Sequence, residues 1–77
     1  MNNSQEKNNN NLENLAENYN EFLDQIFRFI YFRTNNKEIA EDLTQDCFLS
    51  VIKYLKENQV DNLRAFLYKI AKNKLID

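Results

Sequence analysis

Apolar residues recur at the spacing of α-helices from Leu12 to the end of this chain. The first series repeats at i, i+3, i+4 and i+7, and it predicts a helix from near Asn11 to about Arg33. The apolar side of this helix is made of Leu12, Leu15, Ala16, Tyr19, Phe22, Leu23, Ile26 and Ile30. Its first half could equally be a separate short helix, because apolar spacing alone does not distinguish one long helix from two.

A second helix is predicted after the polar break Thr34-Asn35-Asn36, and it continues to about Glu57. Asn35 followed three residues later by Glu38 fits a capping box, in which the Asn side chain accepts a hydrogen bond from a free backbone N–H and the Glu reaches back to the cap. The predicted core stripe of this helix is Ile39, Ala40, Leu43, Cys47, Val51 and Tyr54.

The opposite side of the same helix carries a second set of residues that the core does not explain. This set is Asp42, Gln45, Leu49 and Ile52, with Phe48 at its border. A helix with only one buried stripe is expected to carry charged or small polar residues there, so two aliphatic side chains beside a carboxylate and an amide favour a surface for a partner. Two simpler explanations are that Leu49 and Ile52 are isolated surface residues, or that the third helix covers more of this side.

A polar loop from Lys56 to Asn62 separates the second helix from a third, which is predicted from Leu63 to about Ile76, with Asp61 or Asn62 as its N-cap. The residues predicted to be buried on it are Leu63, Phe66, Leu67, Ile70 and Ala71. Lys69 and Lys72 lie together away from that stripe, and Asn73 lies near its edge. Such a face is most often simply solvated, but its residue types also suit a phosphate backbone or a base edge.

Composition favours a small all-α domain. The chain has 77 residues with no glycine and no proline, so Asn, Asp and Thr must end its helices. Residues 1–11 are polar and rich in asparagine and are expected to be a disordered tail. Residues 12–77 are expected to form one compact domain of three helices, or of four if the first is divided. Because the last helix reaches Asp77 without a terminating signal, we expect the domain to be truncated at its C-terminal end.

Several kinds of chemistry are absent from the sequence. The chain has no histidine and one cysteine, which excludes an internal disulfide and histidine-based catalysis and argues against a zinc site. Cys47 falls on the core stripe, where it is expected to behave as a small apolar residue. No carboxylate lies in a phosphate-binding loop or beside a nucleophile. We therefore expect no enzyme, no cofactor and no metal site, and the lack of a membrane-spanning run or signal peptide indicates a cytoplasmic protein.

The net charge of −2 hides a division of charge along the chain. Residues 12–46 include eight acidic and three basic residues, whereas residues 62–76 include four basic residues and no acidic one. This division favours two different partners, one basic and one acidic.

Two blocks in this order give the chain a resemblance to a known family. The segments AEDLTQDCFL (40–49) and FLYKIAKNKLID (66–77) resemble the AEDLxQ-[DE]-x-F and WLyrIArN-x-x-iD helices in region 2 of bacterial sigma factors of the extracytoplasmic-function type. The resemblance extends over residues 22–77, and the two blocks stand in the same order and at the same distance as in the family.

The resemblance implies a transcription initiation module that binds the clamp helices of the largest RNA polymerase subunit and recognises and melts the minus-ten promoter element as single-stranded DNA. The positions that it assigns to polymerase binding are Asp42, Gln45 and Asp46, with Leu49 and Ile52 close to the same side. The positions that it assigns to DNA binding are Asn58 and Gln59 in the base-capturing loop and Asn73 on the last helix, beside Lys69 and Lys72. It also allows an anti-sigma factor as a further partner.

The chain departs from the family pattern at four points. Phe66 replaces the usual tryptophan, Cys47 replaces valine or alanine, the 56–62 loop has no aromatic residue, and neither the basic segment after Asp77 nor the domain that reads the upstream promoter element is present. An alternative function is therefore a sigma-like interaction module that binds polymerase or another helical partner without touching DNA. A third is a helical domain with an unknown partner.

Overall fold

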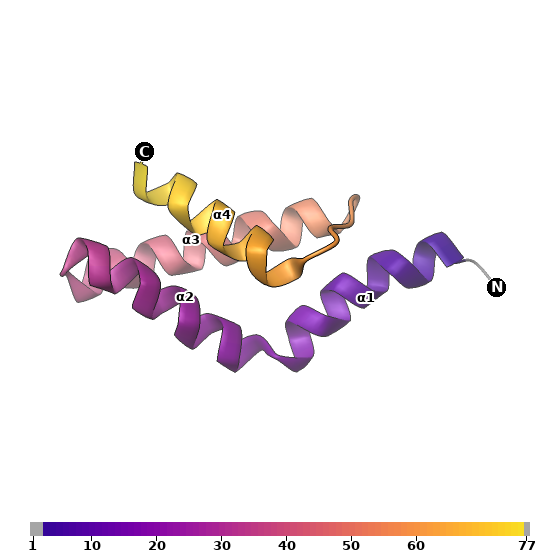
Figure 1. The fold of residues 1–77 in the computed structure, drawn as a ribbon, viewed down its shortest axis with the longest axis horizontal. Helices are drawn as coiled ribbons and strands as arrows, with labels where there is room; N and C mark the ends of the chain where they lie inside the picture. Colours follow the sequence, from indigo (N-terminus) through magenta and orange to yellow (C-terminus); the bar gives the residue numbers. More distant parts are fainter. Residues whose placement is uncertain (1–2, 77) are drawn as a thin grey trace.

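The computed structural model describes the backbone of residues 3–76 and the side chains of residues 10–76. It contains four α-helices: α1 (Asn3–Glu17), α2 (Tyr19–Thr34), α3 (Lys37–Leu55) and α4 (Leu63–Ile76). Residues 3–76 contain no strand, so the all-α prediction is confirmed, in its four-helix form. Helices α2, α3 and α4 pack together, whereas α1 bends away from α2 and passes beside the loop between α3 and α4 (Figure 1).

The division between α1 and α2 lies at Asn18, whose φ of −112° and ψ of 23° leave the helical region. Its side-chain Nδ2 donates to Oδ1 of Asn14 at 2.7 Å and to the carbonyl of Asn14 at 3.0 Å. An asparagine side chain that bonds to nearby backbone in this way competes with continuation of the helix. Because Leu15 and Phe22 on either side of the bend both reach the same core, their spacing could not reveal it.

The junction between α2 and α3 differs from the prediction by one residue. Asn35 is the C-cap of α2 in the left-handed conformation, with a φ of 55°, and its N–H donates to the carbonyl of Tyr31 at 2.8 Å. Asn36 is the N-cap of α3, and its side-chain oxygen accepts from the N–H of Ile39 at 3.0 Å. The predicted capping box of Asn35 and Glu38 is therefore wrong, because the left-handed turn that ends α2 occupies Asn35.

The core lies among α2, α3 and α4, with α1 closing one end. The largest fully buried side chains are Ile26, Ile30, Cys47, Val51, Leu55 and Leu67. Figure 1 shows α4 beside α2 and running in the same direction, with α3 antiparallel to both. The ring contact of Phe29 with Tyr68, at 5.1 Å between centroids, joins α2 to α4 midway along this pair.

The buried stripe of α3 is rotated relative to the predicted one. Ala40, Cys47 and Val51 are buried as predicted, but Ile39 and Tyr54 are 48% and 43% exposed. Leu43 is half-buried, and the positions that complete the stripe are Thr44, Phe48 and Leu55. The physical reason is that α1 and α2 cover one side of α3: the Phe48 ring, for example, meets the Tyr19 ring edge-on at a centroid distance of 5.4 Å.

The ends of the last two helices agree only in part with the prediction. Helix α3 ends at Leu55, two residues before the predicted Glu57. The N-cap of α4 is Asn62, one of the two predicted caps, and its side-chain oxygen accepts from the N–H of Ala65 at 3.0 Å. None of the described helices combines the length and the hydropathy needed to cross a membrane.

Helix α1 begins within the segment for which we predicted a disordered tail. Met1 and Asn2 lie outside the described residues, and disorder of residues 1–11 stays a prediction, as do the domain limits. From Asn10 onward α1 contributes to the core through Leu15, which is buried, and Leu12, which is half-buried.

Candidate functional site

Four of the five positions predicted to bind polymerase are exposed, and three of them lie together on the outward face of α3. Asp42 and Gln45 are exposed, and Leu49 is 66% exposed. All three point away from the buried stripe through Ala40, Cys47 and Val51, as their spacing requires on a helix of 3.6 residues per turn. An exposed aliphatic side chain beside acidic and amide groups agrees with the prediction that this face binds a partner.

The other two predicted positions lie at the borders of that face. Ile52 is half-buried and faces α1 and the start of α2. It lines a hollow there with Leu12, Leu15, Ala16 and Tyr19. Asp46, on the opposite border, forms an ion pair of 3.4 Å with Nζ of Lys74 in α4. The structure therefore joins Asp42, Gln45 and Leu49 in one open face and turns Ile52 toward α1 and Asp46 toward α4.

A groove between α2 and α3 extends the open face in a way that the sequence did not reveal. Its floor is apolar, from Leu23 and Phe27, and its α3 side is formed by Glu41, Thr44 and Gln45. Asn20, Asp24 and Lys37 complete its lining. Because these residues come from two helices, no spacing within either one predicts the groove.

Cys47 lies beneath this face and is fully buried, as predicted. Its thiol donates to the carbonyl of Leu67 at 3.6 Å and so links α3 to α4. Burial raises the pKa of this thiol from its ordinary value of 9.0 to about 11, with Asp46 adding to the rise and the ammonium of Lys74 opposing it. The group is therefore a neutral, unreactive part of the core at physiological pH.

The predicted basic face is present on the second half of α4. Lys69, Lys72 and Asn73 are all exposed and lie opposite the buried Leu67 and Ala71. Lys69 and Lys72 line a shallow groove with Phe29 and Arg33 of α2, together with Ala65 and Tyr68 of α4, and none of these lining residues is acidic.

The loop residues assigned to DNA binding lie at the other end of α4. Asn58 and Gln59 are exposed, and Nδ2 of Asn58 donates to the carbonyl of Tyr54 at 3.1 Å. The loop is also tied to α1, through hydrogen bonds between the Asn11 side chain and the backbone of Val60. Since Lys69 and Asn73 lie six and ten residues after Leu63 on α4, roughly 9 to 15 Å of helix separates the loop from the residues of the basic face. A single extended ligand would be needed to reach both.

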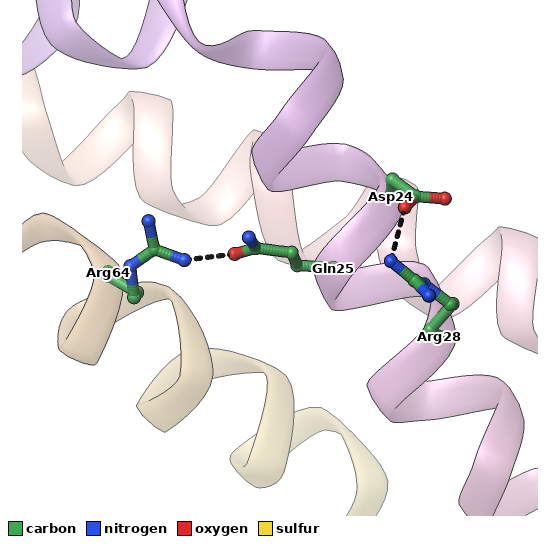
Figure 2. A network of polar contacts seen from close by, with 4 residues as sticks. All are labelled: Asp24, Gln25, Arg28 and Arg64. Carbon is green, nitrogen blue, oxygen red and sulfur yellow. Dashed lines mark hydrogen bonds and ion pairs between the residues drawn. The ribbon is translucent and has the colours of Figure 1, made fainter.

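The first turn of α4 is held against α2 by polar contacts (Figure 2). The guanidinium of Arg64 donates to the side-chain oxygen of Gln25, and it also lies over the Phe22 ring at 5.4 Å from the centroid. One turn further along α2, Arg28 pairs with Asp24 at 2.8 Å within the same helix. The Arg64 contacts join the first turn of α4 to α2, whereas the Arg28–Asp24 pair lies within α2 alone.

Residues 19–77 match the family model described as sigma-70 region 2. The chain belongs to the sigma-70 region 2 family. The match begins at Tyr19, the first residue of α2, so it includes the whole α2–α3–α4 unit and leaves α1 outside. Membership confirms the family that the two sequence blocks indicated.

Curated relatives carry sigma-factor names. The chain is 28% identical over 59 residues to the ECF RNA polymerase sigma factor SigM of Bacillus subtilis, covering 77% of this chain and 36% of SigM. It is 34% identical over 61 residues to the ECF RNA polymerase sigma factor BldN of Streptomyces coelicolor, covering 77% of this chain and 23% of BldN. A probable RNA polymerase sigma factor of Haemophilus influenzae is 35% identical over 54 residues, covering 69% of this chain and 28% of the relative.

This region 2 chain thus spans between about a quarter and about a third of the length of these relatives. No solved structure matches the chain at a significant level.

Proposed function

We propose that this chain is the part of a cytoplasmic sigma factor that docks on the clamp helices of RNA polymerase through α3 and holds the melted minus-ten strand through α4. The observation that supports this best is the presence of two separate exposed faces of opposite character on one small helical unit. One carries Asp42, Gln45 and Leu49, and the other carries Lys69, Lys72 and Asn73.

The α3 face suits a protein partner with a basic, partly apolar helical surface. Carboxylates orient such a contact and speed its formation, whereas burial of an aliphatic residue supplies much of its affinity. Leu49, at 66% exposed, is the apolar residue available for that burial. The groove floored by Leu23 and Phe27 adjoins Gln45 and adds apolar area to the same proposed contact.

The α4 face suits an extended nucleic-acid strand. Lysines bind phosphate, and the Asn73 amide is able to donate and accept hydrogen bonds at a base edge. Asn58 and Gln59, at the far end of the helix, are proposed to meet the same strand at another nucleotide. Because the strand must be unpaired to present its bases, this face is proposed to act on melted promoter DNA.

The two faces are tested by charge reversals measured with the polymerase core of the source organism. Asp42→Arg is expected to weaken polymerase binding at least tenfold, because it opposes like charges in the contact. The double change Lys69→Glu and Lys72→Glu is expected to leave polymerase binding unchanged and to abolish opening of a promoter template. Glu13→Arg makes a matched charge change on an exposed residue of α1 and is expected to affect neither measurement.

Unchanged polymerase binding by Asp42→Arg would remove the docking assignment. Normal promoter opening by the double lysine variant would remove the DNA assignment and favour the interaction-only alternative. Circular dichroism of each variant establishes that the helices are intact.

A further inference from the structure

Two helices form one continuous surface that the family pattern did not assign. We call it the aromatic–basic groove and define it by Phe29, Phe32 and Arg33 of α2 and Tyr68, Lys69 and Lys72 of α4. It consists of two adjoining hollows that share Phe29, Arg33 and Tyr68. Only Lys69 and Lys72 of these residues belong to the DNA face proposed above.

Phe32 is the most exposed large apolar side chain among the described residues, at 87%. Because so little of its ring is removed from water, Phe32 contributes almost nothing to the stability of the fold by burial. A single exposed apolar residue needs no explanation by itself. Phe32, however, lies in a hollow with two other aromatic rings and two arginines, which is the composition of a stacking site.

Arg33 is fixed in a flat arrangement at the centre of the groove. Its guanidinium lies over the Phe29 ring at 3.8 Å from the centroid, and Nη1 donates to the carbonyl of Phe29 at 3.0 Å. The Phe29 ring is in turn held edge-on by Tyr68 of α4. Because Arg33 is exposed, the side of its guanidinium that faces away from Phe29 is open to another planar group.

The charges around the groove have one sign. Arg28, Arg33, Lys69 and Lys72 line its two hollows, and no carboxylate among residues 10–76 does. Asp24 pairs with Arg28 at 2.8 Å, but both side chains are mostly exposed and such a pair is worth little. A polyanion is therefore the ligand that this surface complements.

We infer that the aromatic–basic groove binds a single strand of DNA, with a base stacked on Phe32 and neighbouring phosphates on Arg33, Lys69 and Lys72. Aromatic rings joined to a line of cations are how proteins bind unpaired strands, since every base has a face that stacks. A duplex keeps its bases stacked on one another and offers none to Phe32. This inference rests on the proposed function, and it extends the DNA contact from α4 across to the end of α2.

The stacking contact has a direct optical test, because the chain contains no tryptophan. Phe32→Trp places a single indole in the groove, and stacking against a base is expected to quench its fluorescence when a single-stranded oligonucleotide of the promoter's minus-ten sequence is added to the full chain. Tyr31→Trp is the matched control, because Tyr31 is the preceding residue of α2 and stacks on Phe27 at 5.7 Å, outside the groove. Quenching of both tryptophans alike, or of neither, would overturn the inference.

The contribution of each group is measured as affinity for the same oligonucleotide in the presence of polymerase core. Stacking on an aromatic residue is typically worth about 1 to 3 kcal/mol per base, so Phe32→Ala is expected to weaken binding by roughly five-fold to one hundred-fold, with Phe32→Trp restoring it. Arg33→Ala leaves one phosphate without its cation, so the slope of log affinity against log salt concentration is expected to become shallower by about 0.7. Glu13→Gln changes the charge by one unit at an exposed residue of α1, outside both proposed faces, and is expected to change neither value.

The outcomes separate this inference from the proposed function. Full affinity in Phe32→Ala and Arg33→Ala, together with reduced affinity in the Lys69 and Lys72 variants, would overturn the groove and leave the α4 face in place. Full affinity in all of these variants would remove the DNA function and the groove with it. A loss of polymerase affinity in Phe32→Ala without DNA would show that the groove contacts protein, which also overturns the inference.

Discussion

The side chain of Asn11 and the backbone of Val60 exchange two hydrogen bonds across 49 positions of the sequence. Oδ1 of Asn11 accepts from the N–H of Val60 at 3.0 Å, and Nδ2 donates to the carbonyl of Val60 at 3.3 Å. The side-chain amide of Asn11 thus satisfies both the N–H and the carbonyl of Val60, as the backbone of a paired strand does in a sheet. Helix α1 holds in this way the loop that carries Asn58 and Gln59.

Asn11→Ala is expected to loosen that loop. The change removes two hydrogen bonds of about 0.5 to 1.5 kcal/mol each, so the free energy of unfolding should fall by about 1 to 3 kcal/mol. Hydrogen exchange at the Val60 amide should accelerate more than exchange in α2 and α3. Asn10→Ala is the matched control, since Asn10 is exposed. Equal exchange at Val60 in the wild-type and Asn11→Ala proteins would contradict the role of Asn11.

Phe48 and Leu49 are neighbours in sequence with opposite surroundings, and their truncation should give opposite results. Phe48 is 3% exposed and Leu49 is 66% exposed. Phe48→Ala should lower the free energy of unfolding by about 3 to 5 kcal/mol. Leu49→Ala should change it by less than about 0.5 kcal/mol while weakening polymerase binding. Denaturant unfolding and a polymerase pull-down measure the two effects, and a Leu49→Ala protein that bound polymerase normally would remove Leu49 from the docking face.

The buried thiol of Cys47 should make stability fall at high pH. Its pKa is raised to about 11 in the folded chain, whereas the unfolded chain releases the proton near the ordinary value of 9.0. Between these pH values the thiol is protonated more fully in the folded chain than in the unfolded chain, so a rise in pH favours unfolding. The contribution of the protonated thiol to stability is therefore complete below pH 9.0 and is lost as the pH rises to about 11. The loss should be on the order of 2 to 3 kcal/mol.

Urea unfolding of wild type and Cys47→Ala across this pH range measures that loss. All other ionisable groups are common to the two proteins, so the difference between the two profiles isolates the thiol. Parallel profiles would contradict the prediction. Below pH 9.0, reaction of the thiol with an alkylating reagent should occur only through unfolding.

The left-handed turn at Asn35 should discriminate between glycine and alanine. Asn35 has a φ of 55°, where a residue with a Cβ is strained by about 1 to 2 kcal/mol and glycine is not. Asn35→Ala should therefore lower the free energy of unfolding by about 1 kcal/mol, and Asn35→Gly should leave it unchanged or raise it slightly. Thermal unfolding measures both changes. If alanine and glycine were equally stable here, the turn would not have this conformation in solution.

The sequence predicted the helices better than their orientations. The approximate spans of α3 and α4 follow from apolar spacing, and the outward position of Asp42 and Leu49 follows from the same pattern. The rotation of the α3 stripe toward Phe48 and Leu55 does not, because it depends on where α1 and α2 pack. Local hydrogen bonding decides between Asn35 and Asn36 as the cap, and both residue types suit either role.

The candidate site also has a part that the sequence predicted and a part that depends on how the helices pack. Lys69, Lys72 and Asn73 share a face by helical spacing alone, so the sequence was sufficient to group them. Arg33 lies beside those lysines, and Phe32 lies in the adjoining hollow, because α2 and α4 run in the same direction, which is a property of the packing. The ion pair of Asp46 with Lys74 likewise depends on how α3 and α4 pack, so the sequence could not predict it.

The chain has no glycine or proline, and asparagine residues occupy the bends and ends of its helices. The structure shows whether the side-chain oxygen or the side-chain nitrogen of each asparagine forms the hydrogen bond. At Asn36 and Asn62 the oxygen accepts from a backbone N–H, so conversion to aspartate keeps the cap and adds a charge that the helix start favours. At Asn18 the nitrogen is the donor, and at Asn11 both atoms are in use, so the same conversion removes a bond there. Hydrolysis of these amides to aspartate is thus expected to preserve the caps of the last two helices and to remove hydrogen bonds where α1 meets its neighbours.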